Sequence, residues 1–284
     1  MYLLPRPQEM LLQDNVFYVD YTAEICIDPE ASPEWLHYAS LLQKEIEQDT
    51  GFHLNINRNL PVFQTPSILL KSTSGHSQQE YTLRIRESGI LLTASSNSGM
   101  LYAIQTLRQI IRQEGACLPG LDIHDFPVIS NRGLYYDVTR SRIPTLSYLK
   151  KMADTLSFYK INQLHLYIEH TYMFRNLSEV WRDDTPLTSS DILELDRYCA
   201  DLGIELVPSI ASFGHLYKIL RTKSFRHLCE REDLCEEPFG FIDRMEHHTI
   251  DVSNEESFSF IWSLIEEYLP LFRSDKFNIC GDET

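Results

Sequence analysis

Basic side chains, clustered cysteines and long apolar runs are all scarce in this sequence, and each scarcity excludes a class of function. Lys and Arg together number 25 against 41 Asp and Glu, so the formal net charge at pH 7 is −16. A nucleic-acid site needs a concentrated basic face, so we expect no nucleic-acid partner. No stretch approaches the roughly 18 consecutive apolar residues of a membrane-spanning helix, so we expect no membrane partner.

The six cysteines are scattered, and only Cys229 and Cys235 lie close together. Five residues separate them and no second cluster follows, which fits neither a zinc site nor a disulfide framework. We therefore expect reduced thiols, no metal ion and no cofactor. The stretch Met1–Pro7 lacks the basic segment and apolar run of a secretory leader, which predicts a cytoplasmic location.

Residues 1–125 predict a small α/β domain with an antiparallel sheet. The expected elements are a strand at 16–19, a helix at 33–48, a strand at 67–70, a hairpin at 80–94 and a helix at 98–111. The hairpin is expected because polar and apolar side chains alternate on the way into a turn that contains Gly89. Pro119-Gly120 and the segment His124–Pro127 break the pattern, so the domain boundary is placed near Asp125.

Residues 126–284 change to an alternation of strands and helices, which is typical of a parallel sheet covered by crossover helices. The expected strands are 133–138, 162–168, 204–210 and 276–280, and the expected helices are 147–159, 189–202 and 255–268. Residues 189–191 are expected to cap the second of these helices. Four such units predict the first half of a (β/α)8 TIM barrel, whose complete form takes about 250 residues.

Each predicted barrel strand ends in polar or ionisable residues, which is where barrel enzymes place their working groups. Asp137 ends the first strand, Glu169 and His170 end the second, and His215 follows the third. We expect these side chains to lie on one face of the sheet. Each residue also has a plainer interpretation: Asp137 could pair with Arg140, Glu169 and His170 could be solvated, and His215 could begin the next helix.

The fourth predicted strand ends in two adjacent carboxyl groups, Asp282 and Glu283, directly after Gly281. Such a pair suits cleavage of a glycosidic bond, because one carboxyl can protonate the leaving oxygen while its ionised neighbour orients the substrate. In an acidic protein the same three residues also occur in exposed turns.

Several segments together resemble family 20 glycoside hydrolases, the β-N-acetylhexosaminidases. The segments are Ile129–Arg140, Tyr159–Asn162, Ser212–His215 and Phe277–Thr284. Residues 99–107 are also similar to the end of the non-catalytic α/β domain that precedes the barrel in that family. The similarity covers nearly the whole chain in the family's order.

The resemblance implies removal of terminal β-linked N-acetylhexosamine from glycans, with N-acetylglucosaminides and N-acetylgalactosaminides both open as substrates. It implies a retaining mechanism in which the substrate's acetamido oxygen attacks the anomeric carbon, so that no protein nucleophile is needed. By the same resemblance Glu283 is the general acid/base and Asp282 holds the acetamido N–H. Arg132 matches an arginine that binds sugar hydroxyls, and His215 matches a histidine near the acid. Beside Glu283, an ionised Asp282 is expected to raise the pKa of the acid.

Two departures from the family pattern matter. Many members carry Trp-His-x-x-Asp on the second strand, but here His170 stands at the position of the aspartate. The sequence Tyr167-Ile168-Glu169 is similar to a less typical branch, and Glu169 could replace that aspartate as the partner of His215.

The second departure is that the sequence stops where the family's later strands would bring a tyrosine and tryptophans to the sugar. We therefore expect a barrel truncated after its fourth strand, a fragment with low or no activity alone. The alternatives are a non-catalytic carbohydrate-binding or degenerate protein, and a metal-dependent barrel hydrolase in which His170 and His215 are the candidate ligands.

Overall fold

The computed structural model describes two compact units. The described residues are 1–59, 66–140, 142–231 and 248–281. Unit 1 comprises Met1–Arg132 and Thr155–Ile161, and unit 2 comprises Gly133–Asp154 and Asn162–Thr284. Among the described residues, no helix is long and apolar enough to cross a membrane.

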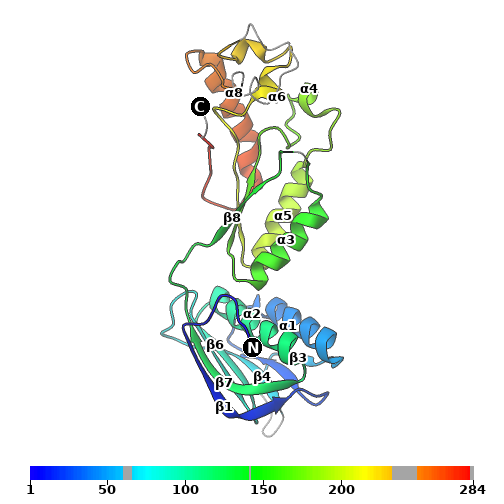
Figure 1. Ribbon diagram of the computed structural model, residues 1–284, viewed down its shortest axis with the longest axis vertical. Coiled ribbons are helices and arrows are strands. Elements are labelled where there is room, and N and C mark those ends of the chain that lie inside the picture. The colour runs from blue at the N-terminus through cyan, green and yellow to red at the C-terminus, as the bar shows by residue number, and fades with distance from the viewer. Residues whose placement is uncertain (60–65, 141, 232–247, 282–284) are drawn as a thin grey trace. The chain divides into compact units, whose positions relative to one another are not determined.

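Within its described residues, unit 1 is built on a seven-stranded sheet with the order β1-β7-β5-β6-β4-β2-β3 (Figure 1). The strands are β1 (Glu9–Tyr18), β2 (Glu24–Ile27), β3 (Asn55–Asn57), β4 (Ser67–Ser72), β5 (Tyr81–Arg86), β6 (Gly89–Ala94) and β7 (Cys117–Asp125). The sheet is mixed, which corrects the prediction of an antiparallel sheet, because β2 pairs in parallel with both β3 and β4, and β4 with β6. A helix between β2 and β3 supplies the crossover that a parallel pair requires.

Two helices, α1 (Trp35–Thr50) and α2 (Asn97–Glu114), lie side by side on one face of this sheet (Figure 1). The α2 helix begins where the Ser96 hydroxyl accepts the backbone N–H of Gly99 at 3.0 Å. Between the helices, Glu45 is only 2% exposed, and both Arg108 and Arg112 bind its carboxylate. The core of unit 1 therefore combines apolar packing with buried ion pairs.

The segment Thr155–Ile161 belongs to unit 1, although it follows the first barrel strand in the sequence. The guanidinium of Arg112 lies 4.1 Å from the centre of the Phe158 ring. Lys160 is buried, and its Nζ donates to the Tyr81 hydroxyl at 2.8 Å and to Asp125 Oδ2 at 3.0 Å. This segment thus completes the packing of the first unit.

In the described part of unit 2, a parallel three-stranded sheet has the order β10-β9-β8, with helices α3 and α5 side by side next to it (Figure 1). The strands are β8 (Gly133–Asp137), β9 (Gln163–Tyr167) and β10 (Glu205–Val207). The helices are α3 (Leu146–Phe158), whose last residues from Thr155 belong to unit 1, α4 (Ser178–Trp181), α5 (Ser189–Asp201), α6 (Tyr217–Leu220), α8 (Glu255–Tyr268), and the short 3-10 turns η1 (Arg226–Leu228) and η3 (Leu269–Leu271). Parallel strands paired in chain order with intervening helices form the opening part of a (β/α)8 barrel, as predicted.

The predicted fourth strand is only partly realised. Asn278 forms an isolated parallel bridge with Ser209, donating its N–H to Pro208 O at 3.0 Å and accepting the N–H of Ile210 at 3.1 Å. Because Pro208 has no N–H to offer, the ladder between these segments stays short. The chain nevertheless runs beside the end of β10, where a fourth barrel strand belongs.

The α5 helix starts from a different cap than predicted. Thr188 is the N-cap residue, and its hydroxyl accepts the backbone N–H of Asp191 at 3.2 Å. In return the Asp191 carboxylate accepts the backbone N–H of Thr188 at 2.8 Å. This reciprocal capping box puts the N-cap residue one position before the predicted capping segment 189–191, while the helix itself begins at Ser189 as predicted.

Candidate active site

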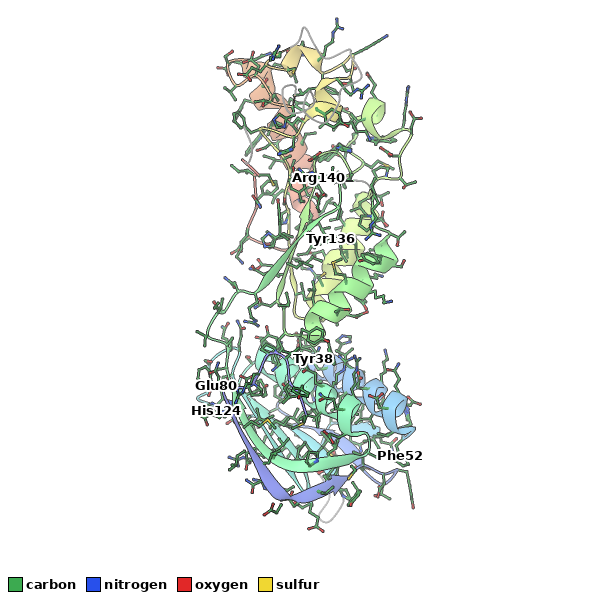
Figure 2. All side chains as sticks on the ribbon, in the orientation of Figure 1. Tyr38, Phe52, Glu80, His124, Tyr136 and Arg140 are labelled. Atoms are coloured by element: carbon green, nitrogen blue, oxygen red, sulfur yellow. The ribbon has the colours of Figure 1, made fainter. Side chains whose placement is uncertain are left out.

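Four ionisable side chains lie together at the ends of β8 and β9 and in the loop after β10. Three of them were predicted site residues, and the fourth is Arg140. Arg140 joins them: its Nη1 lies 2.8 Å from Asp137 Oδ2, and its Nη2 lies 3.4 Å from Glu169 Oε1. The same Nη2 lies 3.3 Å from Nδ1 of His215. Figure 2 places Tyr136 on β8 and Arg140 beyond the carboxyl end of that strand. We call Asp137, Arg140, Glu169 and His215 the Arg140 cluster.

Asp137 organises the turn that carries Arg140. Its Oδ1 accepts the backbone N–H of Thr139 at 2.8 Å and of Arg140 at 3.0 Å, while Oδ2 accepts from the Arg140 side chain. Burial alone would raise the pKa of Asp137, but the hydrogen bonds from Arg140 and Thr139 lower it overall. An ionised Asp137 therefore folds the chain back so that the arginine returns over the strand end.

Glu169 is the buried carboxyl group of the cluster, with 3% exposure. The Tyr167 hydroxyl donates to its Oε1 at 3.0 Å, and its backbone N–H is held by the Thr139 hydroxyl at 3.1 Å. Burial raises the pKa of Glu169, and the Tyr167 hydrogen bond with the charges of Arg140 and His215 offsets only part of that effect. This carboxyl group therefore takes up a proton more readily than an exposed glutamate.

Glu169 lies between two histidines. Its Oε1 is 3.7 Å from His215 Nδ1, and its Oε2 is 3.7 Å from His170 Nδ1. Glu169 therefore lies near His215, where it can replace the usual aspartate as the partner of that histidine, an option that the sequence left open. His170 contributes its ring to the other side of the same carboxylate.

The guanidinium of Arg140 is paired with carboxyl groups and is also partly exposed to solvent. Burial would lower the pKa of its guanidinium, but the bond to Asp137 and the charge of Glu169 raise it, so it stays charged. The guanidinium lies 5.0 Å from the centre of the Tyr167 ring, a cation–π contact. Its side chain is 47% exposed, so part of this rigid fork of donors faces solvent.

Arg132, the predicted sugar-binding arginine, is not part of the Arg140 cluster. It belongs to unit 1 and directly precedes β8, at the opposite end of that strand from Asp137. Its guanidinium donates to the Tyr102 hydroxyl, the Gln79 side chain, and the backbone carbonyls of Ile129, Ser130 and Lys160, at 2.7 to 3.0 Å. The sequence named Arg140 only as a possible partner of Asp137; that pairing is confirmed, but Arg140 was not counted among the substrate-binding residues.

The two predicted catalytic carboxyl groups, Asp282 and Glu283, lie outside the described residues. The described chain reaches Gly281, and Cys280 before it adopts the left-handed conformation with φ 47°. The Cys280 Sγ lies 3.1 Å from the Ser209 hydroxyl and 3.2 Å from the Tyr135 hydroxyl. The segment that leads to Asp282 is therefore anchored against the loop after β10 and against β8.

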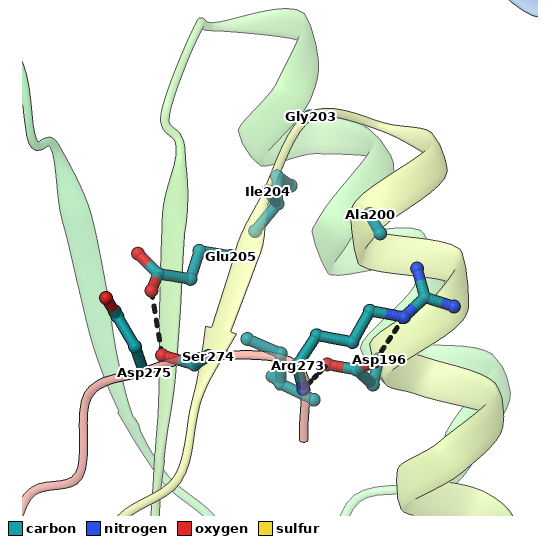
Figure 3. Close-up of a pocket in the computed structure, with 9 residues that line it drawn as sticks. Asp196, Ala200, Gly203, Ile204, Glu205, Arg273, Ser274 and Asp275 are labelled. Carbon is teal, nitrogen blue, oxygen red and sulfur yellow. Dashed lines mark hydrogen bonds and ion pairs between the residues drawn. The ribbon is translucent and has the colours of Figure 1, made fainter. Parts of the chain in front are cut away.

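A separate pocket of about 470 Å³ lies at the amino end of β10, where Gly203 and Ile204 lead into the strand (Figure 3). Two interactions link its polar side chains: Arg273 Nε lies 3.2 Å from Asp196 Oδ2, and the Ser274 hydroxyl donates to Glu205 at 2.7 Å. Barrel chemistry takes place at the opposite ends of the strands, so we assign no catalytic role to this pocket. Within the described ranges, no three His, Cys, Asp or Glu side chains are arranged to hold a metal ion.

Comparison with known protein families gives two matches along the chain. Residues 1–126 match the model for glycosyl hydrolase family 20, domain 2. Residues 130–284 match the model for the glycosyl hydrolase family 20 catalytic domain.

Two curated relatives are β-hexosaminidases. That of Porphyromonas gingivalis is 25% identical, and the match covers 99% of this chain and 38% of the relative. That of Akkermansia muciniphila is 28% identical, with 68% of this chain and 39% of the relative covered. The chain therefore spans about two fifths of the length of these relatives.

Two similar solved structures share the fold. The family 20 β-N-acetylhexosaminidase from Streptomyces coelicolor superposes with a TM-score of 0.83 at 22% identity, covering 99% of this chain and 60% of that one. A mutant Streptomyces plicatus β-hexosaminidase in complex with its product GlcNAc gives a TM-score of 0.82 at 21% identity, covering 99% and 59%.

Proposed function

This chain belongs to glycosyl hydrolase family 20, and from that premise we propose that the protein carrying it removes terminal β-linked N-acetylhexosamine from glycans. The relatives named above are β-hexosaminidases, and one similar solved structure holds GlcNAc as product. These activities are those of the relatives, and the chain covers only part of the relatives' length. The proposal therefore concerns hydrolysis by the intact natural protein.

The observation that carries the proposal is the Arg140 cluster at the carboxyl ends of the barrel strands. A half-exposed guanidinium, two carboxylates and a histidine gather on the face where barrel enzymes bind their substrates. The planar fork of Arg140 suits neighbouring sugar hydroxyls, since several donors are held in fixed directions. We assign to Arg140 the sugar-binding task that the sequence assigned to Arg132.

The finer mechanism follows from the sequence resemblance. Glu283 protonates the leaving oxygen and later activates water, while Asp282 holds the acetamido N–H. The acetamido oxygen attacks the anomeric carbon, and water then opens the cyclic intermediate, so that configuration is retained. The position of Cys280 beside Ser209 and Tyr135 supports this assignment, because Cys280 precedes Asp282 by two residues and contacts both β8 and the loop after β10.

The anomeric configuration of the first product tests this proposal. We expect the intact natural protein to release the aglycone from an aryl N-acetyl-β-glucosaminide, with the β-anomer of GlcNAc appearing first by NMR. The matched 2-hydroxy glucoside should react far more slowly, because it lacks the attacking acetamido group. An α-anomer as first product, or equal rates on both glycosides, contradicts substrate assistance. Glycan binding without turnover favours the non-catalytic alternative.

A further inference from the structure

His215 has an uncommon backbone conformation for a residue with a side chain. Its φ is 58°, in the left-handed region that L residues other than glycine seldom adopt. Two hydrogen bonds from a distant segment bracket it: Leu216 donates its N–H to His248 O at 2.9 Å, and Ile250 donates to Phe213 O at 3.0 Å. A conformation of this kind persists where its surroundings fix it.

A third hydrogen bond from this part of the chain is accepted by a side chain. The backbone N–H of His215 donates to Nδ1 of His248 at 3.0 Å. Both residues are buried, at 6% and 4% exposure, and their rings meet edge to face with centroids 4.9 Å apart. Because Nδ1 accepts, the imidazole of His248 is neutral and carries its proton on Nε2.

The backbone of His215 determines where its ring lies. That ring meets the Tyr167 ring edge to face at 6.3 Å, and its Nδ1 reaches Arg140 at 3.3 Å and Glu169 at 3.7 Å. A rotation about φ would swing the Cα–Cβ bond and separate the ring from these partners. The acceptor that holds the His215 N–H therefore also fixes the geometry of the Arg140 cluster.

We propose that His248 is a positioning residue for catalysis, which holds His215 in its left-handed conformation through the bond from the His215 N–H to Nδ1. The proposal rests on the proposed hydrolase function, in which the Arg140 cluster binds the substrate. His248 itself touches no reacting atom.

Three substitutions in the intact natural protein separate this role from simple packing. His248→Leu fills space but offers no acceptor, His248→Asn places Oδ1 near the position of Nδ1, and His248→Gln carries its oxygen one bond farther along the side chain. We expect Leu and Gln to lower kcat/KM by on the order of 10-fold to 100-fold, as a displacement of about 1 Å can do. Asn should recover most of the activity. His227→Leu, an exposed histidine of the same unit, is the control and should leave activity unchanged.

Hydrogen exchange gives a readout that does not depend on turnover. The peptide covering residues 213–216 should exchange faster in His248→Leu and His248→Gln than in the natural protein and in His248→Asn. Unchanged protection in His248→Leu, or equal activity of the Asn and Gln variants, overturns the proposal. If the natural protein cleaves no hexosaminide, the hydrolase function fails, and the exchange pattern still decides whether His248 holds His215.

Discussion

Two arginines eight positions apart have opposite surroundings, and conservative substitution separates their tasks. Arg140→Lys removes a planar fork from the Arg140 cluster, so we expect kcat/KM to fall on the order of 100-fold with little change in stability. Steady-state kinetics and thermal unfolding on the intact natural protein measure both. Arg142→Lys is the control, since Arg142 is exposed and lies just beyond the cluster.

For Arg132→Lys the balance should be reversed. Lysine cannot satisfy the five acceptors that Arg132 serves within unit 1, so we expect a loss of about 1–3 kcal/mol in the free energy of unfolding. Turnover by the folded protein should change little. A large rise in KM without loss of stability would return the sugar-binding role to Arg132.

Glu169 and Asp137 should give opposite pH dependences of stability. The pKa of Glu169 is raised above its ordinary 4.5, chiefly by burial, so its contribution is present at lower pH and is lost as pH rises through the folded-state value. Glu169→Gln should remove this loss. The pKa of Asp137 is lowered below 3.8, so its contribution is present above 3.8 and is lost as pH falls; Asp137→Asn should remove it. Urea unfolding over a pH series measures both, and slopes of the same sign would contradict the assignment.

At the scale of elements, the three long helices α3, α5 and α8 were predictable, and the strand β7 next to the edge of the first sheet was not. The period of 3.6 residues predicted α8 at 255–268 and placed α3 and α5 within one residue at each end. The strand β7 was missed because Pro119 and Gly120 indicated a turn. In the structure Gly120 sits inside β7, where a Cβ would collide with Asn15 of β1, beside a register shift between Leu12 and Val16. This close approach joins segments that are distant in the sequence, so no local sequence pattern predicts it.

The residues of the candidate site were also only partly predictable from the sequence. The strand-end rule found Asp137, Glu169 and His215, which the structure brings together. It named Arg140 only as a possible partner of Asp137 and not as a site residue, because the turn made by Asp137 returns that side chain to the strand end only in three dimensions. His248 gave no signal, since it lies 33 residues from His215 along the chain.

The capping box at the start of α5 is an element whose contribution can be measured alone. Thr188→Ala removes a hydroxyl that accepts the Asp191 N–H, so we expect a loss of about 1 kcal/mol in the free energy of unfolding. Ser190→Ala, at an exposed helix position beside it, is the control and should change stability little. Equal effects of the two substitutions in urea unfolding would show that Thr188 does not cap the helix.

On the scale of the whole molecule, unit 1 does not end where its continuous sequence ends. Phe158 packs under Arg112, and Lys160 binds Tyr81 and Asp125. A fragment of residues 1–132 lacks both, which leaves Asp125 without its buried cation. We expect a fragment of residues 1–161 to unfold at a higher temperature and more cooperatively than the shorter one, by on the order of 3 kcal/mol in stability. Equal melting curves would show that the second segment is dispensable to unit 1.

The second segment of unit 1 also sets an order of events during synthesis. A ribosome releases the chain from its amino end, and a domain that is continuous in sequence can fold before its successor emerges. Here the ion pair between Lys160 and Asp125 can form only after β8 and the whole of α3 have left the exit tunnel. The first barrel strand and helix therefore leave the ribosome before unit 1 has its last segment. The folding of unit 1 thus overlaps with the synthesis of unit 2.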